Sequence, residues 1–186
     1  MKKLILFAAV ALGLSSVVLQ SCKKHHMEPP PKPTLYDSLG GTAMVADPMD
    51  SKSQIEAGRL LIRNIIDSTI FVIAGDPSIN GHFTVLLAEV GSGNLSGFQE
   101  LSKNLTDFVA VGTGAKNYKY TGMDMVSTHD PAQNPRMNGK ADNDDLDSFE
   151  KDLFMGAGKA GVPATTPALI SVGKIVESLR SQVVQK

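Results

Sequence analysis

The sequence predicts an all-α domain that follows an export signal and a short tether. After residue 34, apolar residues recur every three or four positions through most of the chain, which is the period of an amphipathic helix. No stretch alternates between apolar and polar residues for long enough to predict a strand. Aromatic residues make up only 5% of the chain and tryptophan is absent, a composition that suits closely packed helices better than a sugar-binding groove.

Residues 1–21 are typical of a cleavable secretion signal. Lys2 and Lys3 precede an apolar run, Leu4 to Leu14, that is too short to span a bilayer. The stretch Leu19-Gln20-Ser21-Cys22 resembles the lipobox of bacterial lipoproteins. Cys22 is the only cysteine and has no partner in the chain for a disulfide, so we expect lipidation there and an extracytoplasmic lipoprotein anchored to a membrane of the bacterial envelope.

Residues 22–34 form a tether rich in lysine, histidine and proline. Its prolines favour extended polyproline geometry, which would space the domain at 35–186 from the membrane. The formal net charge of the whole chain is −1, too weak and mixed to indicate nucleic acid as a partner.

The first two long helices are bounded by clear stop signals. One is expected over Ser53 to Ala74, where Ser53-Gln54-Ile55-Glu56 has capping-box spacing and Gly75-Asp76-Pro77 follows the last turn. Another is expected over Leu95 to Val111, because apolar residues recur at helical spacing up to Gly112-Thr113-Gly114.

Three further helices are expected toward the end of the chain. Thr121-Gly122-Met123-Asp124 has capping-box spacing and predicts a short helix that ends before Pro131, with His129 in its last turn. Apolar stripes then run from Leu146 to Ala157 and from Leu169 to Val183. We expect these last two helices to pack as an antiparallel pair.

Several short motifs follow one another in a distinctive order. They are Leu35-Tyr36-Asp37-Ser38-Leu39-Gly40-Gly41, Ile65-Ile66-Asp67, Ala74-Gly75-Asp76-Pro77, His82-Phe83, Leu105-Thr106-Asp107-Phe108, Tyr120-Thr121-Gly122-Met123-Asp124-Met125, Gly161-Val162-Pro163 and the stretch from Val176 to Val184. This order resembles that of the truncated haemoglobins, bacterial globins of the group 1 type. His82-Phe83 takes the place of that family's paired phenylalanines, and His129 takes the place of its haem-ligating histidine.

The resemblance implies a helical fold of the two-over-two globin type that binds haem. The connections between Thr42 and Ile65, between Phe83 and Leu105, and from Pro131 to Asn143 are longer than in a compact member of the family. By the resemblance, His129 ligates the iron, and a diatomic gas, oxygen or NO, binds at the haem. The other residues expected around the haem are Phe83, Leu101, Leu105, Phe108, Met125 and Ile70, with Met123 and Val126 as further wall residues.

The distal side of the predicted pocket departs from the family. Ile70 and Leu101 stand where relatives often carry a tyrosine and a glutamine that hydrogen-bond the ligand. Bound oxygen would then lack a strong donor, unless Thr69, Gln99 or Asn104 turns into the pocket. His82 is expected to be a structural histidine and not a second ligand.

Other classes of function have weaker support in the sequence. There is no Gly-x-Ser-x-Gly elbow and no catalytic cysteine, so a hydrolase is not indicated, and a haem-dependent redox activity such as NO dioxygenation is the open case for an enzyme. The aspartates from Asp142 to Asp147 lack the glycine and final glutamate of an EF-hand and are interpreted as a helix start. The main alternative is a globin-shaped envelope lipoprotein without haem, acting as a binding or structural module. The redox partner is not indicated.

Overall fold

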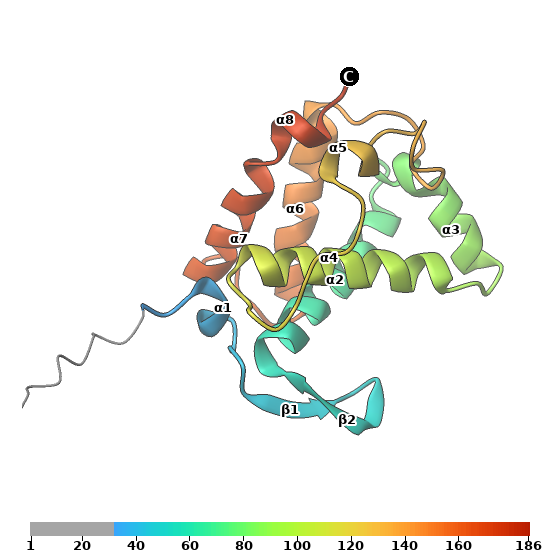
Figure 1. Cartoon of the computed structure of the whole chain (residues 1–186). Helices are drawn as coiled ribbons and strands as arrows, with labels where there is room; N and C mark the ends of the chain where they lie inside the picture. The colour runs from blue at the N-terminus through green and yellow to red at the C-terminus, as the bar shows by residue number, and fades with distance from the viewer. Residues whose placement is uncertain (1–31) are drawn as a thin grey trace, which may run out of the picture. The chain divides into compact units, whose positions relative to one another are not determined.

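Residues 32–186, the part of the chain that the computed structural model describes, are built mainly from α-helices (Figure 1). The predicted signal, Cys22 and nearly all of the tether lie outside these residues. The prediction of a predominantly helical domain is confirmed. The helices are α1 (Leu35–Ser38), α2 (Ala57–Gly75), the 3-10 helix η1 (Asn80–Phe83), α3 (Thr84–Gly91), α4 (Ser96–Gly112), α5 (Met125–Thr128), α6 (Asn143–Lys159), α7 (Pro167–Glu177) and α8 (Arg180–Val183).

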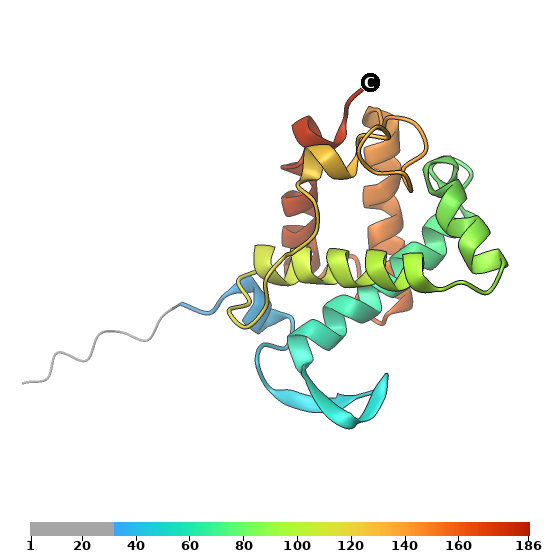
Figure 2. The same cartoon turned by 45° about the vertical axis from the view of Figure 1, so that its right-hand side comes forward.

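The structure contains a β-hairpin that was not predicted. Ser53 lies in this hairpin, so the expected start of a helix at Ser53 is wrong. Strand β1 (Met44–Asp47) pairs antiparallel with β2 (Asp50–Glu56), so residues 53–56 lie in a strand and α2 begins only at Ala57. The hairpin turns at Pro48-Met49, where the Asp47 side chain accepts a 2.9 Å hydrogen bond from the Met49 amide. Such Asx turns reverse the chain without a helix. The hairpin projects beyond the start of α2 (Figures 1 and 2).

The short first helix ends in the Gly40-Gly41 turn. Both glycines have positive φ, 118° and 61°, which other residues adopt at a cost. The turn passes so close to α2 that the Gly58 amide donates a 3.0 Å hydrogen bond to the Gly41 carbonyl. A Cβ on Gly58 would lie 2.9 Å from the ring of Tyr36, so this crossing requires glycine.

The core forms where α2 crosses α4 and α6. Ile62, Ile66, Leu153 and Leu169 are almost completely buried there. Helices α6 and α7 run antiparallel as predicted (Figure 1), but the last predicted helix is broken into α7 and α8 near Ser178. Within residues 32–186, no helix is both long enough and apolar enough to cross a membrane.

Candidate functional site

A large cavity lies between α4 and α5, and most of its lining is apolar. Its volume is about 1030 Å³, at the upper end of the usual range for ligand pockets. Its walls come from several elements far apart in the sequence. They include Ile66, Ile70 and Ile73 of α2, Leu101, Leu105 and Phe108 of α4, Leu146, Phe149 and Leu153 of α6, and Leu179 and Val183 near the end of the chain.

The structure brings together in this cavity nearly all the residues that the sequence suggested for a haem site. His129, Phe83, Leu101, Leu105, Phe108, Met125 and Ile70 all line it, as does Met123. Val126 does not line the cavity, and its side chain is 48% exposed. It lies on the solvent side of α5, so its expected place in the wall is wrong.

His129 directly follows the single turn of α5. The helix starts three residues later than predicted from Thr121, because the Asp124 side chain caps it by accepting a 3.0 Å hydrogen bond from the Ser127 amide. His129 therefore occupies the C-cap position and not the last turn. Its Nδ1 lies 2.8 Å from the carbonyl oxygen of Met125. A carbonyl can only accept, so Nδ1 carries the proton and Nε2 keeps its lone pair.

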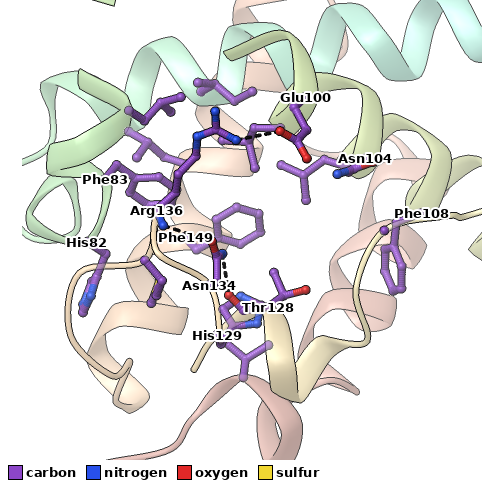
Figure 3. A pocket seen from close by; sticks show the side chains of 18 of the residues that line it. His82, Phe83, Glu100, Asn104, Phe108, Thr128, His129, Asn134, Arg136 and Phe149 are labelled. Atoms are coloured by element: carbon purple, nitrogen blue, oxygen red, sulfur yellow. Dashed lines mark hydrogen bonds and ion pairs between the residues drawn. The ribbon is translucent and has the colours of Figure 1, made fainter. Parts of the chain in front are cut away.

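The surroundings of His129 favour the neutral imidazole. Burial lowers its pKa below the ordinary value of 6.5, and the nearby His82 lowers it further, while the bond to the Met125 carbonyl acts in the opposite direction. Within residues 32–186, Nε2 has no hydrogen-bond partner (Figure 3). A neutral nitrogen with a free lone pair at the wall of an apolar cavity is a suitable metal ligand.

Side chains from three other segments hold α5 in place. Tyr120 donates to the Met123 carbonyl at 2.6 Å, Asn134 to the Thr128 carbonyl at 2.8 Å, and Gln185 to the Val126 carbonyl at 2.7 Å. One helical turn is too short to be stable alone, so these bonds fix the position of His129. These bonds could not be predicted from the sequence, since they join residues far apart or within irregular loops.

His82 also lines the cavity, but both of its ring nitrogens are engaged. Nδ1 lies 2.7 Å from the Asn138 carbonyl oxygen, and Nε2 lies 3.0 Å from a carboxylate oxygen of Asp145. These contacts tie η1 to the loop before α6 and to α6 itself. The geometry agrees with the expectation of a structural histidine.

The wall formed by α2 and α4 carries one amide side chain. Of the three donors considered from the sequence, only Asn104 lines the cavity. Thr69 is fully buried and donates to the Ile65 carbonyl at 2.8 Å, and Gln99 is exposed. The Asn104 side chain has no hydrogen bond to another part of the described chain (Figure 3), so it is free to bond a ligand.

The charged residues of the lining were not predicted. Arg136, in the loop between α5 and α6, forms ion pairs with Glu89 of α3 and Glu100 of α4. Lys103 pairs with Asp107 at 2.9 Å. The sequence shows these residues as ordinary surface charges, because nothing in a loop's composition states which helix it contacts.

Iron held only by protein side chains has no ready site in the described part of the chain. No group of three or more His, Cys, Asp or Glu side chains among residues 32–186 is arranged to hold a bare metal ion. The cavity offers one imidazole with a free nitrogen, that of His129, which fits a metal that brings most of its own ligands. Comparison of the chain with protein-family models, with curated proteins and with solved structures gives no match.

Proposed function

We propose that this domain is a globin-like, haem-binding module that binds a diatomic gas, oxygen or NO, with His129 as the protein ligand of the iron. The observation that carries the proposal is the free Nε2 of His129 at the wall of an apolar cavity of about 1030 Å³. A porphyrin needs an apolar slot, one axial imidazole and a few polar contacts for its carboxylates.

The residues present fit that group. The bond from Nδ1 of His129 to the Met125 carbonyl orients the ring and increases the basicity of Nε2, as hydrogen bonds to the other ring nitrogen of ligating histidines do. Phe108, Leu105 and Phe83 offer flat or branched apolar surface to a porphyrin. When bound, haem would supply an iron centre at which a small gas binds.

Residues from different walls of the cavity would then contribute to binding. On the α5 side, His129 would hold the iron, and Asp124 caps the turn that positions this histidine. Asn104 of α4 would be able to donate a hydrogen bond to the gas, and Leu101 of α4 and Ile70 of α2 would exclude water. Exclusion of water strengthens such a polar contact, because the local dielectric constant is low.

The order of the helices also supports the proposal. The motif order resembles truncated haemoglobins, and α2 and α4 cross on one side while α6 and α7 run antiparallel (Figure 2). The long connection between Thr42 and Ile65 forms the β-hairpin and the first turns of α2. This addition lies away from the cavity lining and is compatible with haem binding.

We further propose that the domain acts outside the cytoplasm as a lipoprotein of the bacterial envelope. The lipobox-like sequence that ends at Cys22 carries this part of the proposal. A lipid anchor would hold the module at a membrane surface, where the proline-rich tether spaces it from the bilayer.

A haem titration followed by absorbance tests the function. The purified domain mixed with one equivalent of haem should give an intense, shifted Soret band, and the band should differ in His129→Ala. His82→Ala is the matched control, because His82 lines the same cavity with both nitrogens engaged, and its ferrous spectrum should match the unmodified protein. A domain that gives no Soret shift would favour the module without haem.

A further inference from the structure

Arg136 spans from the loop between α5 and α6 to two helices on the other side of the cavity. Its Nε lies 3.3 Å from Glu89 Oε1 on α3, and its Nη1 lies 2.6 Å from Glu100 Oε2 on α4. Its side chain lies along the cavity lining (Figure 3). Nη2 has no hydrogen-bond partner within residues 32–186, so its N–H groups are free to bond a ligand.

The backbone of Arg136 is linked to α5 through Asn134. The Arg136 amide donates a 3.1 Å hydrogen bond to the Asn134 side chain, which in turn donates to the Thr128 carbonyl. Thr128 is the neighbour of His129. Arg136 is therefore held at a defined place relative to the proposed iron ligand.

The two glutamates hold Arg136 differently. The Glu89 side chain is 22% exposed and its Oε2 is buried against α4 near Gly97, whereas the Glu100 side chain is 61% exposed. A buried partner is costly to remove, and an exposed ion pair contributes little. Glu100 is the partner that can leave.

We propose that Arg136 is the carboxylate-binding group of the cavity and that Glu100 competes with the ligand for it. The inference rests on the proposed function, because the ligand meant is a tetrapyrrole with carboxylate side chains. Two glutamates face one arginine, so this end of the cavity repels an anion until Glu100 turns away. A carboxylate that replaces Glu100 can bond both Nη1 and Nη2, which is the favoured fork geometry of arginine.

If Glu100 competes with the ligand, substitutions of Glu100 and of Arg136 should change the affinity for haem in opposite directions. Glu100→Gln removes the competing charge and should tighten haem binding by about two- to fivefold, as expected for an exposed pair. Arg136→Met removes the carboxylate partner and should weaken binding by about three- to tenfold. In the double variant, Glu100→Gln should have no further effect. Arg136→Lys keeps the charge without the fork and should fall in between.

The test uses three tetrapyrroles titrated into the full mature domain: haem, haem dimethyl ester and iron-free protoporphyrin IX. The ester lacks free carboxylates, so its affinity should be the same in all Glu100 and Arg136 variants. Protoporphyrin IX keeps the carboxylates but has no iron, and it should repeat the haem pattern even in a His129→Ala background. Thermal unfolding of each variant checks that the fold is kept.

The outcomes separate this inference from the proposed function. Equal or weaker haem binding by Glu100→Gln, or an ester that responds like haem, would overturn the role of Arg136. A protein that shows the predicted pattern with protoporphyrin IX but no iron signal from His129 would keep the carboxylate site and contradict the proposed function. Failure to bind any of the three ligands would contradict both.

Discussion

The Nδ1 atom of His129 lies 2.8 Å from the carbonyl oxygen of Met125, one helical turn earlier in the chain. This bond ties the imidazole to the backbone of α5 and leaves only Nε2 to face the cavity. The position of the ring thus depends on α5 as a whole, and α5 is held by Tyr120, Asn134 and Gln185. The position of Nε2 therefore depends on contacts from three other segments, of which only the one that contains Gln185 is distant in the sequence.

His129 is expected to take up a proton only at a pH below the ordinary value for histidine, because its ring is largely buried. Burial lowers its pKa below 6.5, so as pH falls below 6.5 the unfolded chain takes up a proton before the folded one does. The free energy of unfolding should therefore decrease with pH below 6.5 and level off below the lowered pKa. NMR titration of the ring nitrogens should give a midpoint under 6.5 with the proton on Nδ1. His129→Gln should reduce the pH dependence, and a midpoint at or above 6.5 would refute this environment.

Asn104 is expected to control the release of oxygen. If it donates a hydrogen bond worth about 0.5–1.5 kcal/mol, Asn104→Leu should speed oxygen dissociation by about two- to tenfold. Carbon monoxide is less polar when bound and should respond less. Ile70→Tyr adds a donor from the α2 wall and should slow oxygen release. Flash photolysis and stopped-flow mixing measure these rates. Unchanged oxygen release in Asn104→Leu would show that Asn104 does not contact the gas.

The crossing of α2 and α6 requires a glycine at one position. A Cβ on Gly156 would overlap the backbone and side chain of Thr69, whereas a Cβ on Gly158 of the same helix would meet nothing within 4 Å. Gly156→Ala should lower the free energy of unfolding by about 1–3 kcal/mol through overpacking. Gly158→Ala, the matched control, should raise it by up to about 1 kcal/mol through helix propensity. Urea denaturation measures the free energy of unfolding of both variants. Equal effects would argue against the close approach of Gly156 to Thr69.

Cys22 is expected to be needed for attachment to the membrane. The weakly acidic chain shows no other feature that would attract anionic lipid, so Cys22→Ala should move the protein from the membrane fraction to the soluble fraction. Mass spectrometry of the mature unmodified protein should find acyl chains on the new N-terminal residue. A Cys22→Ala protein that stays in the membrane fraction would rule out the anchor.

Much of the helical framework could be predicted from periodicity and stop signals. The expected helix over Leu95 to Val111 corresponds to α4, and the stripe that begins at Leu146 corresponds to α6. Most of the apolar residues that line the cavity with His129 could also be predicted, because those of α4, Leu101, Leu105 and Phe108, recur at helical spacing. Local pattern is sufficient where one face of a helix decides the structure.

The parts that escaped prediction depend on long-range contacts. The capping-box spacing at Ser53 was misleading because Ser53 to Glu56 pair with β1, and the Glu56 carboxylate bonds Tyr36 at 2.7 Å instead of capping α2. Arg136 and Gln185 reach their partners across the fold. Sequence spacing cannot reveal such partners, since a loop can approach any helix of suitable charge.

Rescue of a cavity variant by imidazole tests the central claim most directly. His129→Gly removes the ligand and leaves space for free imidazole at the same place. The unmodified ferrous protein loaded with haem should give an iron–histidine vibration in resonance Raman spectra. That band should be absent from His129→Gly and return, slightly shifted, when imidazole is added. An unchanged band in His129→Gly without imidazole would contradict the assignment of His129 as the iron ligand.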